Sequence, residues 1–106
     1  MTILDIKDLS QWESFCESHD VCIVKYYLTD CAPCRLLSPS FKKLSEDLGV
    51  PAAQVLLSDF DKSAFPYIEK APIVEFWKKG QTVQRFSGRE LSYLKMKPIL
   101  QELLKE

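Results

Sequence analysis

The sequence predicts an α/β domain in which a mixed sheet of four to five strands is covered by helices on both faces. Apolar segments rich in β-branched and aromatic residues alternate with segments whose apolar residues recur every three or four positions. This alternation is typical of parallel strands joined by right-handed helical crossovers. Two further strands near the C-terminus, separated by a short turn, predict an antiparallel hairpin at the edge of the sheet. The length of 106 residues indicates a single domain, residues 1–106.

The first half of the chain predicts two strands and two helices in alternation. We expect a short strand at Thr2–Ile6, and then a helix with Ser10 as its N-cap and Glu13 completing a capping box. Val21–Leu28 is almost entirely apolar, which predicts a central strand buried on both faces. A second amphipathic helix should end at Gly49. Its apolar face is formed by Leu37, Phe41, Leu44 and Leu48.

The second half predicts a strand at Gln54–Phe60 and a short irregular helix at Ser63–Lys70. The hairpin follows, with strands at Ile73–Trp77 and Thr82–Phe86 around a glycine-containing turn. From Arg89 to the end the pattern is helical. The predicted order is therefore β-α-β-α-β-α-β-β-α.

Composition and charge exclude several classes of partner. The net charge is −1 and the acidic and basic residues are interleaved, so we expect neither a nucleic-acid nor a membrane partner. No apolar run approaches the roughly 20 residues that span a bilayer, and the N-terminus lacks the pattern of a secretory signal. We therefore expect a cytoplasmic location, where structural disulfides are rare. The four cysteines are then core residues, metal ligands or redox thiols.

Cys31 and Cys34 lie where the buried strand ends and the next helix begins. The free N–H groups and the dipole of a helix N-terminus favour an anion, and such a site lowers the pKa of a thiol. Cys34 follows one helical turn later, so the two sulfurs can form a small disulfide ring, and Pro33 stiffens the turn between them. A CxxC pair at a strand-to-helix junction within a βαβ pattern predicts thiol–disulfide exchange.

Two other interpretations of the cysteines are structural thiols and a zinc site. Cys31 and Cys34 would be poor structural thiols, because a loop and a helix start are difficult to bury. A zinc site usually needs four ligands, which Cys16, Cys22 and His19 would have to complete. We expect no metal, because core packing explains Cys16 and Cys22 better.

The segment CAPCRLLSP resembles the active-site motif of the thioredoxin family. The resemblance covers almost the whole chain and implies the thioredoxin fold. It implies that Cys31 is the nucleophile and Cys34 the resolving cysteine, on an active-site turn formed by Ala32 and Pro33. Arg35 occupies the usual basic position of the motif.

The segment KAPIVEFWKKGQTVQRFSG is similar to a second signature of the family. The resemblance implies that Pro72 adopts the cis conformation and faces the disulfide. It also implies that the backbone of Ala71, together with Ser87 and Gly88, binds an extended substrate segment through strand-like hydrogen bonds.

Several positions depart from the family pattern. Asp30 replaces the usual tryptophan before the first cysteine, and Ala32 replaces the glycine between the cysteines. Asp30 opposes a thiolate at Cys31, whereas Arg35 favours it. The loss of the tryptophan removes apolar surface for docking, so we expect partners that differ from those of a typical thioredoxin.

Lys25 stands where a typical thioredoxin has a buried acid, and two interpretations of it are open. Its ammonium either reaches the surface and pairs with Asp59 or Asp61, or it lies near Cys34. In the second case the cation would favour the Cys34 thiolate and make the disulfide more oxidising.

The sequence thus predicts a monomeric enzyme that reduces protein disulfides through the Cys31/Cys34 couple and needs no cofactor of its own. Electrons would come from a thioredoxin reductase or another thiol donor, which places the protein in electron transport and cell redox homeostasis. The alternative is a non-catalytic thioredoxin-like adaptor, because one fold hosts many functions. A glutathione-linked, glutaredoxin-like activity is a third and weaker interpretation.

Overall fold

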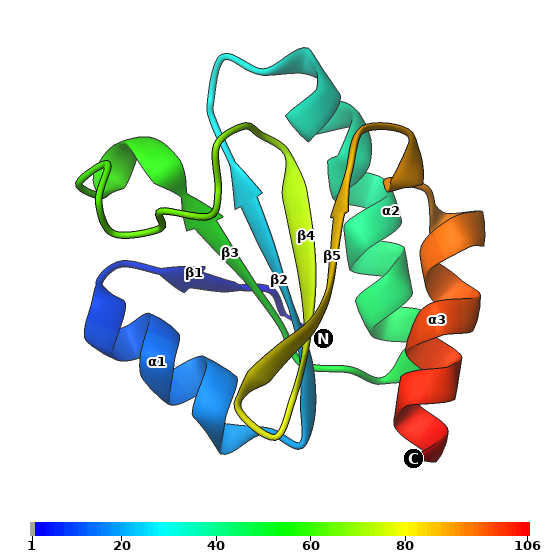
Figure 1. Ribbon diagram of the computed structural model, residues 1–106. Helices are drawn as coiled ribbons and strands as arrows, with labels where there is room; N and C mark the ends of the chain where they lie inside the picture. The colour runs from blue at the N-terminus through cyan, green and yellow to red at the C-terminus, as the bar shows by residue number, and fades with distance from the viewer. Residues whose placement is uncertain (1) are drawn as a thin grey trace.

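The computed structural model describes residues 2–106 and contains a five-stranded mixed sheet with the strand order β1-β3-β2-β4-β5 (Figure 1). Strands β1, β3 and β2 are parallel to one another, while β4 runs antiparallel to β2 and β5 antiparallel to β4. The predicted mixed sheet with a hairpin edge is therefore confirmed. The strands are β1 (Leu4–Ile6), β2 (Val21–Tyr27), β3 (Ala52–Leu56), β4 (Ile73–Lys78) and β5 (Gln81–Ser87).

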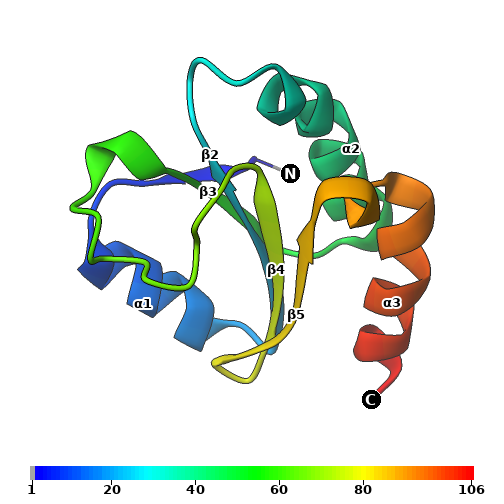
Figure 2. The ribbon, with the colours of Figure 1, turned by 45° about the horizontal axis from the view of Figure 1, so that its top comes forward.

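Helices cover both faces of this sheet, as predicted, and residues 2–106 contain three α-helices. Figure 2 shows α1 (Leu9–Ser18) on one side, and α2 (Ala32–Leu48) and α3 (Tyr93–Lys105) together on the other. Each face has its own apolar core, because side chains of successive strand residues point to opposite sides. Short 3-10 turns, η1 (Leu57–Asp59) and η2 (Gly88–Glu90), follow β3 and β5.

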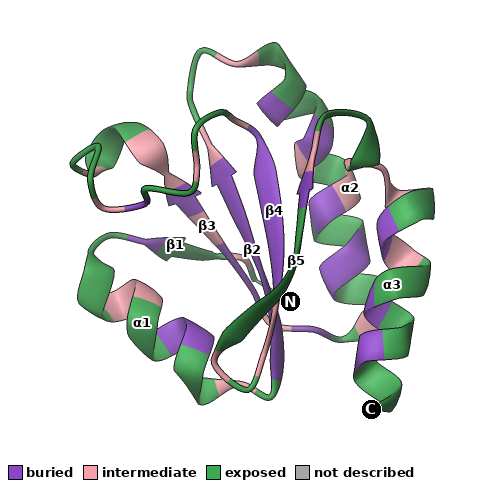
Figure 3. Ribbon diagram, viewed as in Figure 1, coloured by how far each residue is buried: buried purple, intermediate pink, exposed green. Residues whose placement is uncertain are grey.

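Strand β2 is the centre of the fold, and the turn with Cys31 and Cys34 follows its end. It pairs with β3 on one side and β4 on the other, and six of its seven residues are buried (Figure 3). Helix α2 begins five residues after β2 ends and packs with Leu37, Phe41 and Leu44 buried against the sheet. The helix ends at Gly49, whose φ of 63° is the left-handed conformation that glycine adopts easily. The predicted cap at Gly49 is confirmed.

One predicted helix cap and one predicted helix start were wrong. The N-cap of α1 is Asp8, not Ser10, because the Asp8 carboxylate accepts a hydrogen bond of 2.8 Å from the N–H of Gln11. The C-terminal helix begins at Tyr93, not Arg89, since Ser92 caps it and residues 88–90 form the separate turn η2.

The segment after β3 also differs from the prediction. Strand β3 ends at Leu56, where its pairing with β2 ends, so it covers residues 52–56 instead of 54–60. Residues 63–70 form turns and no helix. Asp61 accepts hydrogen bonds from the N–H and hydroxyl of Ser63, and Phe65 is buried against the rings of Trp12 and Tyr26. These contacts hold the segment as turns, and Pro66 in its middle cannot donate a backbone hydrogen bond of a helix.

Candidate active site

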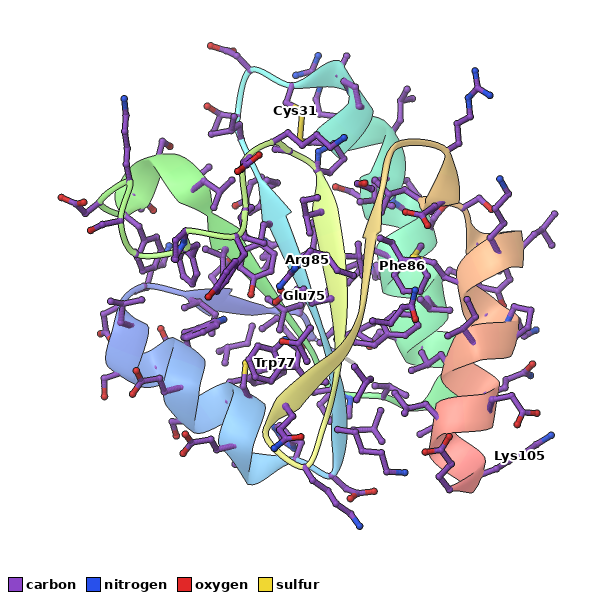
Figure 4. The ribbon with its side chains drawn as sticks, in the orientation of Figure 1. Cys31, Glu75, Trp77, Arg85, Phe86 and Lys105 are labelled. Atoms are coloured by element: carbon purple, nitrogen blue, oxygen red, sulfur yellow. A yellow bond between two sulfur atoms is a disulfide. The ribbon has the colours of Figure 1, made fainter. Side chains whose placement is uncertain are left out.

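Cys31 and Cys34 form a disulfide at the junction of β2 and α2, with their Cα atoms 5.2 Å apart (Figure 4). Cys31 is the N-cap of α2, and its sulfur lies 3.3 Å from the N–H donor of Cys34. Its carbonyl accepts the N–H of Arg35 at 3.2 Å, which starts the helix. The Cys31 sulfur thus lies among the unpaired N–H groups of a 17-residue helix, a position that stabilises a thiolate.

The two sulfurs differ in their access to solvent. Cys31 is partly exposed, whereas Cys34 is 2% exposed. Ala32 and Pro33 are exposed on the turn between them. Cys31 is therefore the more accessible member of the pair.

Pro72 lies on the same cavity as the active-site turn, and the Ala71–Pro72 peptide bond is cis. The cavity has a volume of about 350 Å³, and its lining includes Pro33, Ala71 and Gly88. Residues far apart in the chain, Pro33, Ala71 and Gly88, are thus brought together around the disulfide turn. Ser87 does not line this cavity, and its N–H donates to the Glu90 carboxylate at 3.2 Å.

A larger cavity of about 660 Å³ lies next to the first and shares Lys70 and Ala71 with it. Its walls include Leu28, Phe60 and Ile68. The residues after β3 therefore supply apolar surface beside Ala71. Sequence reasoning missed this surface because it assigned the segment to a helix.

Asp30 and Arg35 are both exposed, on opposite sides of the active-site turn in sequence. The Arg35 guanidinium donates a hydrogen bond of 3.2 Å to the carbonyl of Thr29, which holds it along the loop that precedes Cys31. A carboxylate and a guanidinium therefore stand before and after the Cys31–Cys34 pair in the chain.

Lys25 is buried, with 3% of its surface exposed, and its side chain points to the face of the sheet that α2 covers. Neither Asp59 nor Asp61 forms an ion pair with it among residues 2–106, so the surface-pairing interpretation was wrong. The Asp61 carboxylate instead accepts hydrogen bonds from Ser63.

The Lys25 amine has one hydrogen-bond acceptor and two aromatic neighbours. It lies 3.0 Å from the Ser38 hydroxyl, and that hydroxyl lies 3.2 Å from the carbonyl of Cys34. The rings of Tyr27 and Phe41 are 5.2 and 5.4 Å away. Burial lowers the pKa of Lys25, against a smaller opposite effect of Asp5. Sequence reasoning missed Ser38, since nothing in its local pattern distinguishes it from a solvated helix serine.

A buried acid on the opposite face of the sheet was also missed. Glu75, 3% exposed, accepts hydrogen bonds from the Tyr26 hydroxyl at 2.5 Å and the Trp77 indole at 3.1 Å. Arg85 contacts its second oxygen at 2.8 and 2.9 Å (Figure 4). Trp12 completes the network through its hydrogen bond to Tyr26. The sequence feature that could have indicated this network is an acidic residue, Glu75, within an apolar strand.

Cys16 and Cys22 are free and buried in the core beneath α1, as expected of packing residues. A hydrogen bond with Cys22, together with burial, raises the pKa of the Cys16 thiol. Within residues 2–106, no cluster of three or more cysteine, histidine or acidic side chains could hold a metal ion. None of the helices described is long and apolar enough to cross a membrane.

Comparison with known proteins agrees with this geometry. The thioredoxin family model matches residues 4–102. The chain is 32% identical to the thioredoxin of Callithrix jacchus over 80% of this chain and 83% of that protein. It is 29% identical to the thioredoxin of Coprinus comatus over 78% and 82% of the two chains. The fold matches a mutant thioredoxin of Halobacterium salinarum with a TM-score of 0.85 and 19% identity, covering 94% and 88%. The chain therefore belongs to the thioredoxin family, and it is an oxidoreductase of protein disulfides whose redox couple is Cys31 and Cys34.

Proposed function

We propose that Cys31 is the nucleophile and Cys34 the resolving cysteine of this couple. The difference in exposure carries the proposal, because only Cys31 can be reached by a substrate. The Cys31 thiolate attacks one sulfur of a protein disulfide, and the other substrate sulfur leaves as a thiolate. The Cys34 thiolate then attacks the Cys31 sulfur. This step closes the Cys31–Cys34 disulfide and releases the second substrate sulfur in reduced form.

The substrate segment binds beside the disulfide in extended form. The backbone of Ala71 and residues Pro72 and Gly88, which share the smaller cavity with the turn, supply the contact surface. Ser87 contributes through its carbonyl, since its N–H is already bonded to Glu90. Apolar substrate side chains fit the larger cavity next to Ala71.

Three charged residues tune the couple. Arg35 favours the Cys31 thiolate, and Asp30 on the other side opposes it. Lys25 is linked to the Cys34 backbone through the Ser38 hydroxyl. Its positive charge favours the Cys34 thiolate, which stabilises the reduced form. Lys25 therefore makes this disulfide more oxidising than one above a buried acid.

The family implies disulfide-containing protein substrates and a thioredoxin reductase as electron donor. We also propose that the protein is a monomer with one domain, residues 1–106. It would act in the cytoplasm, in cell redox homeostasis. Another thiol donor is the alternative source of electrons.

A redox titration tests the couple. The protein is equilibrated in glutathione buffers of known potential, its free thiols are alkylated, and the modified cysteines are mapped by mass spectrometry. We expect a reversible two-electron couple confined to Cys31 and Cys34, with Cys16 and Cys22 as internal controls that stay reduced. A pair that never forms a disulfide would refute the proposal.

The roles within the pair need a separate test. The Cys34→Ser variant should trap a stable mixed disulfide between Cys31 and a disulfide-bonded protein such as insulin. The Cys31→Ser variant should trap none, because Cys34 is buried. Equal trapping by both variants would overturn the assignment.

A further inference from the structure

We propose that Ser38 is a positioning residue that holds the Lys25 amine beneath the resolving cysteine. The inference rests on the proposed function of the Cys31/Cys34 couple. Ser38 lies on α2 one helical turn after Cys34 and is partly exposed. No feature of the sequence motif distinguishes it.

The direction of the hydrogen bonds fixes the arrangement. A serine hydroxyl has one proton to donate and lone pairs to accept. The Ser38 hydroxyl donates to the Cys34 carbonyl at 3.2 Å, and the Lys25 amine donates to the Ser38 oxygen at 3.0 Å. Ser38 thus joins Lys25 to the backbone of the helical turn that carries the reacting sulfur.

The carboxylate of Asp5 offers the amine another partner across the sheet. Lys25 pairs in register with Gln54 on β3, and Gln54 pairs with Asp5 on β1. The Gln54 amide donates to the Asp5 carboxylate at 2.6 Å, and Asp5 attracts the Lys25 charge. The rings of Tyr27 and Phe41 lie at similar distances from the amine, 5.2 and 5.4 Å. Ser38 is therefore the contact that ties the amine to the Cys34 backbone instead of to this edge of the sheet.

The consequence concerns the reduced state of the enzyme. A cation beneath Cys34 favours the thiolate formed when the disulfide is reduced. Loss of the Ser38 hydroxyl releases the amine toward Asp5, so the reduced form loses part of this stabilisation. Ser38 acts only through Lys25 and has no effect of its own on the couple.

A double-mutant cycle on the oxidised and reduced protein tests this coupling. The redox equilibrium constant against glutathione is measured for the wild type, Ser38→Ala, Lys25→Met and the double variant. We expect Lys25→Met to shift the constant about tenfold toward the oxidised protein, which corresponds to about 30 mV. Ser38→Ala should shift it about threefold in the same direction. The double variant should match Lys25→Met alone.

Two further variants control for structural effects. Ser45→Ala removes another α2 serine, whose hydroxyl donates to the Val50 carbonyl at 2.6 Å far along the helix, and should leave the constant unchanged. Ser38→Thr keeps the hydroxyl and should behave as the wild type. A threefold shift by Ser38→Ala that persists in the Lys25→Met background would overturn the inference, as would a folded Ser38→Ala without any shift. The proposed function is tested separately, because it fails if the wild type shows no Cys31/Cys34 couple or if both Cys→Ser variants trap substrate equally, and neither result depends on Ser38.

Discussion

Replacement of Lys25 by methionine should stabilise the oxidised protein at neutral pH. Lys25 is 3% exposed, and its amine has a hydroxyl and two aromatic rings as neighbours, with no ion pair among residues 2–106. Methionine keeps the apolar stem of the side chain and removes the buried amine. The substitution therefore separates the energetic cost of burying Lys25 from its packing.

The expected magnitude follows from opposing contributions. Burial of an unpaired ion costs several kcal/mol in real proteins. The hydrogen bond to Ser38 returns about 2 kcal/mol, and the ring contacts about 1 kcal/mol. We expect a net gain of about 1 to 2 kcal/mol for Lys25→Met. For a domain of this size, that gain raises the melting temperature by about 4 to 16 °C.

The gain should depend on pH with a defined sign. Burial lowers the pKa of Lys25 in the folded protein below its ordinary value of 10.5. Between the lowered pKa of the folded protein and 10.5, Lys25 is protonated to a greater extent in the unfolded chain than in the folded chain. The free energy of unfolding of the wild type therefore rises with pH through this range. The advantage of Lys25→Met, which has no such group, should shrink as the pH approaches 10.5.

Thermal unfolding followed by circular dichroism at pH 7 and pH 10 measures both effects. Lys42→Met, an exposed lysine on the same helix as Ser38, is the matched control and should change little. The gain should also be larger in the oxidised than in the reduced protein, because the Cys34 thiolate partly compensates the cation. A Lys25→Met variant no more stable than the wild type, or a gain independent of pH, would refute this reasoning.

Two further predictions concern stability, and urea denaturation measures both. Arg85→Met should cost about 2 kcal/mol, because it leaves the buried Glu75 carboxylate with two neutral donors and no cation. The double variant Glu75→Met/Arg85→Met should recover part of this loss, and a loss that only grows would contradict the explanation. Gly49→Ala should cost about 1 to 2 kcal/mol from its φ of 63° alone, since open space surrounds the added methyl group. Gly49→Asn should cost less, and equal losses would indicate a cause other than backbone conformation.

Local patterns were sufficient for the framework of the protein. The alternation of apolar strands and amphipathic helices predicted the sheet, its hairpin edge and helices on both faces, because periodicities of 2 and 3.6 are properties of the backbone itself. The CAPC segment indicated the redox couple in the same way, since a helix N-terminus lies wherever an amphipathic helix begins. The cap at Gly49 also depends on neighbouring residues alone.

Contacts between residues that are distant in sequence determine the structure of residues 63–70 and the surroundings of the buried charges. Residues 63–70 have local features of a helix, yet Phe65 packs against side chains from α1 and β2 and holds the segment as turns. Lys25 and Glu75 are each one charge within an apolar strand, and the sequence does not say which face or partner each one has. The tertiary structure places Lys25 under α2 with Ser38, and Glu75 under α1 with Arg85. The physical reason is that a buried charge depends on groups brought to it by folding, which no local pattern contains.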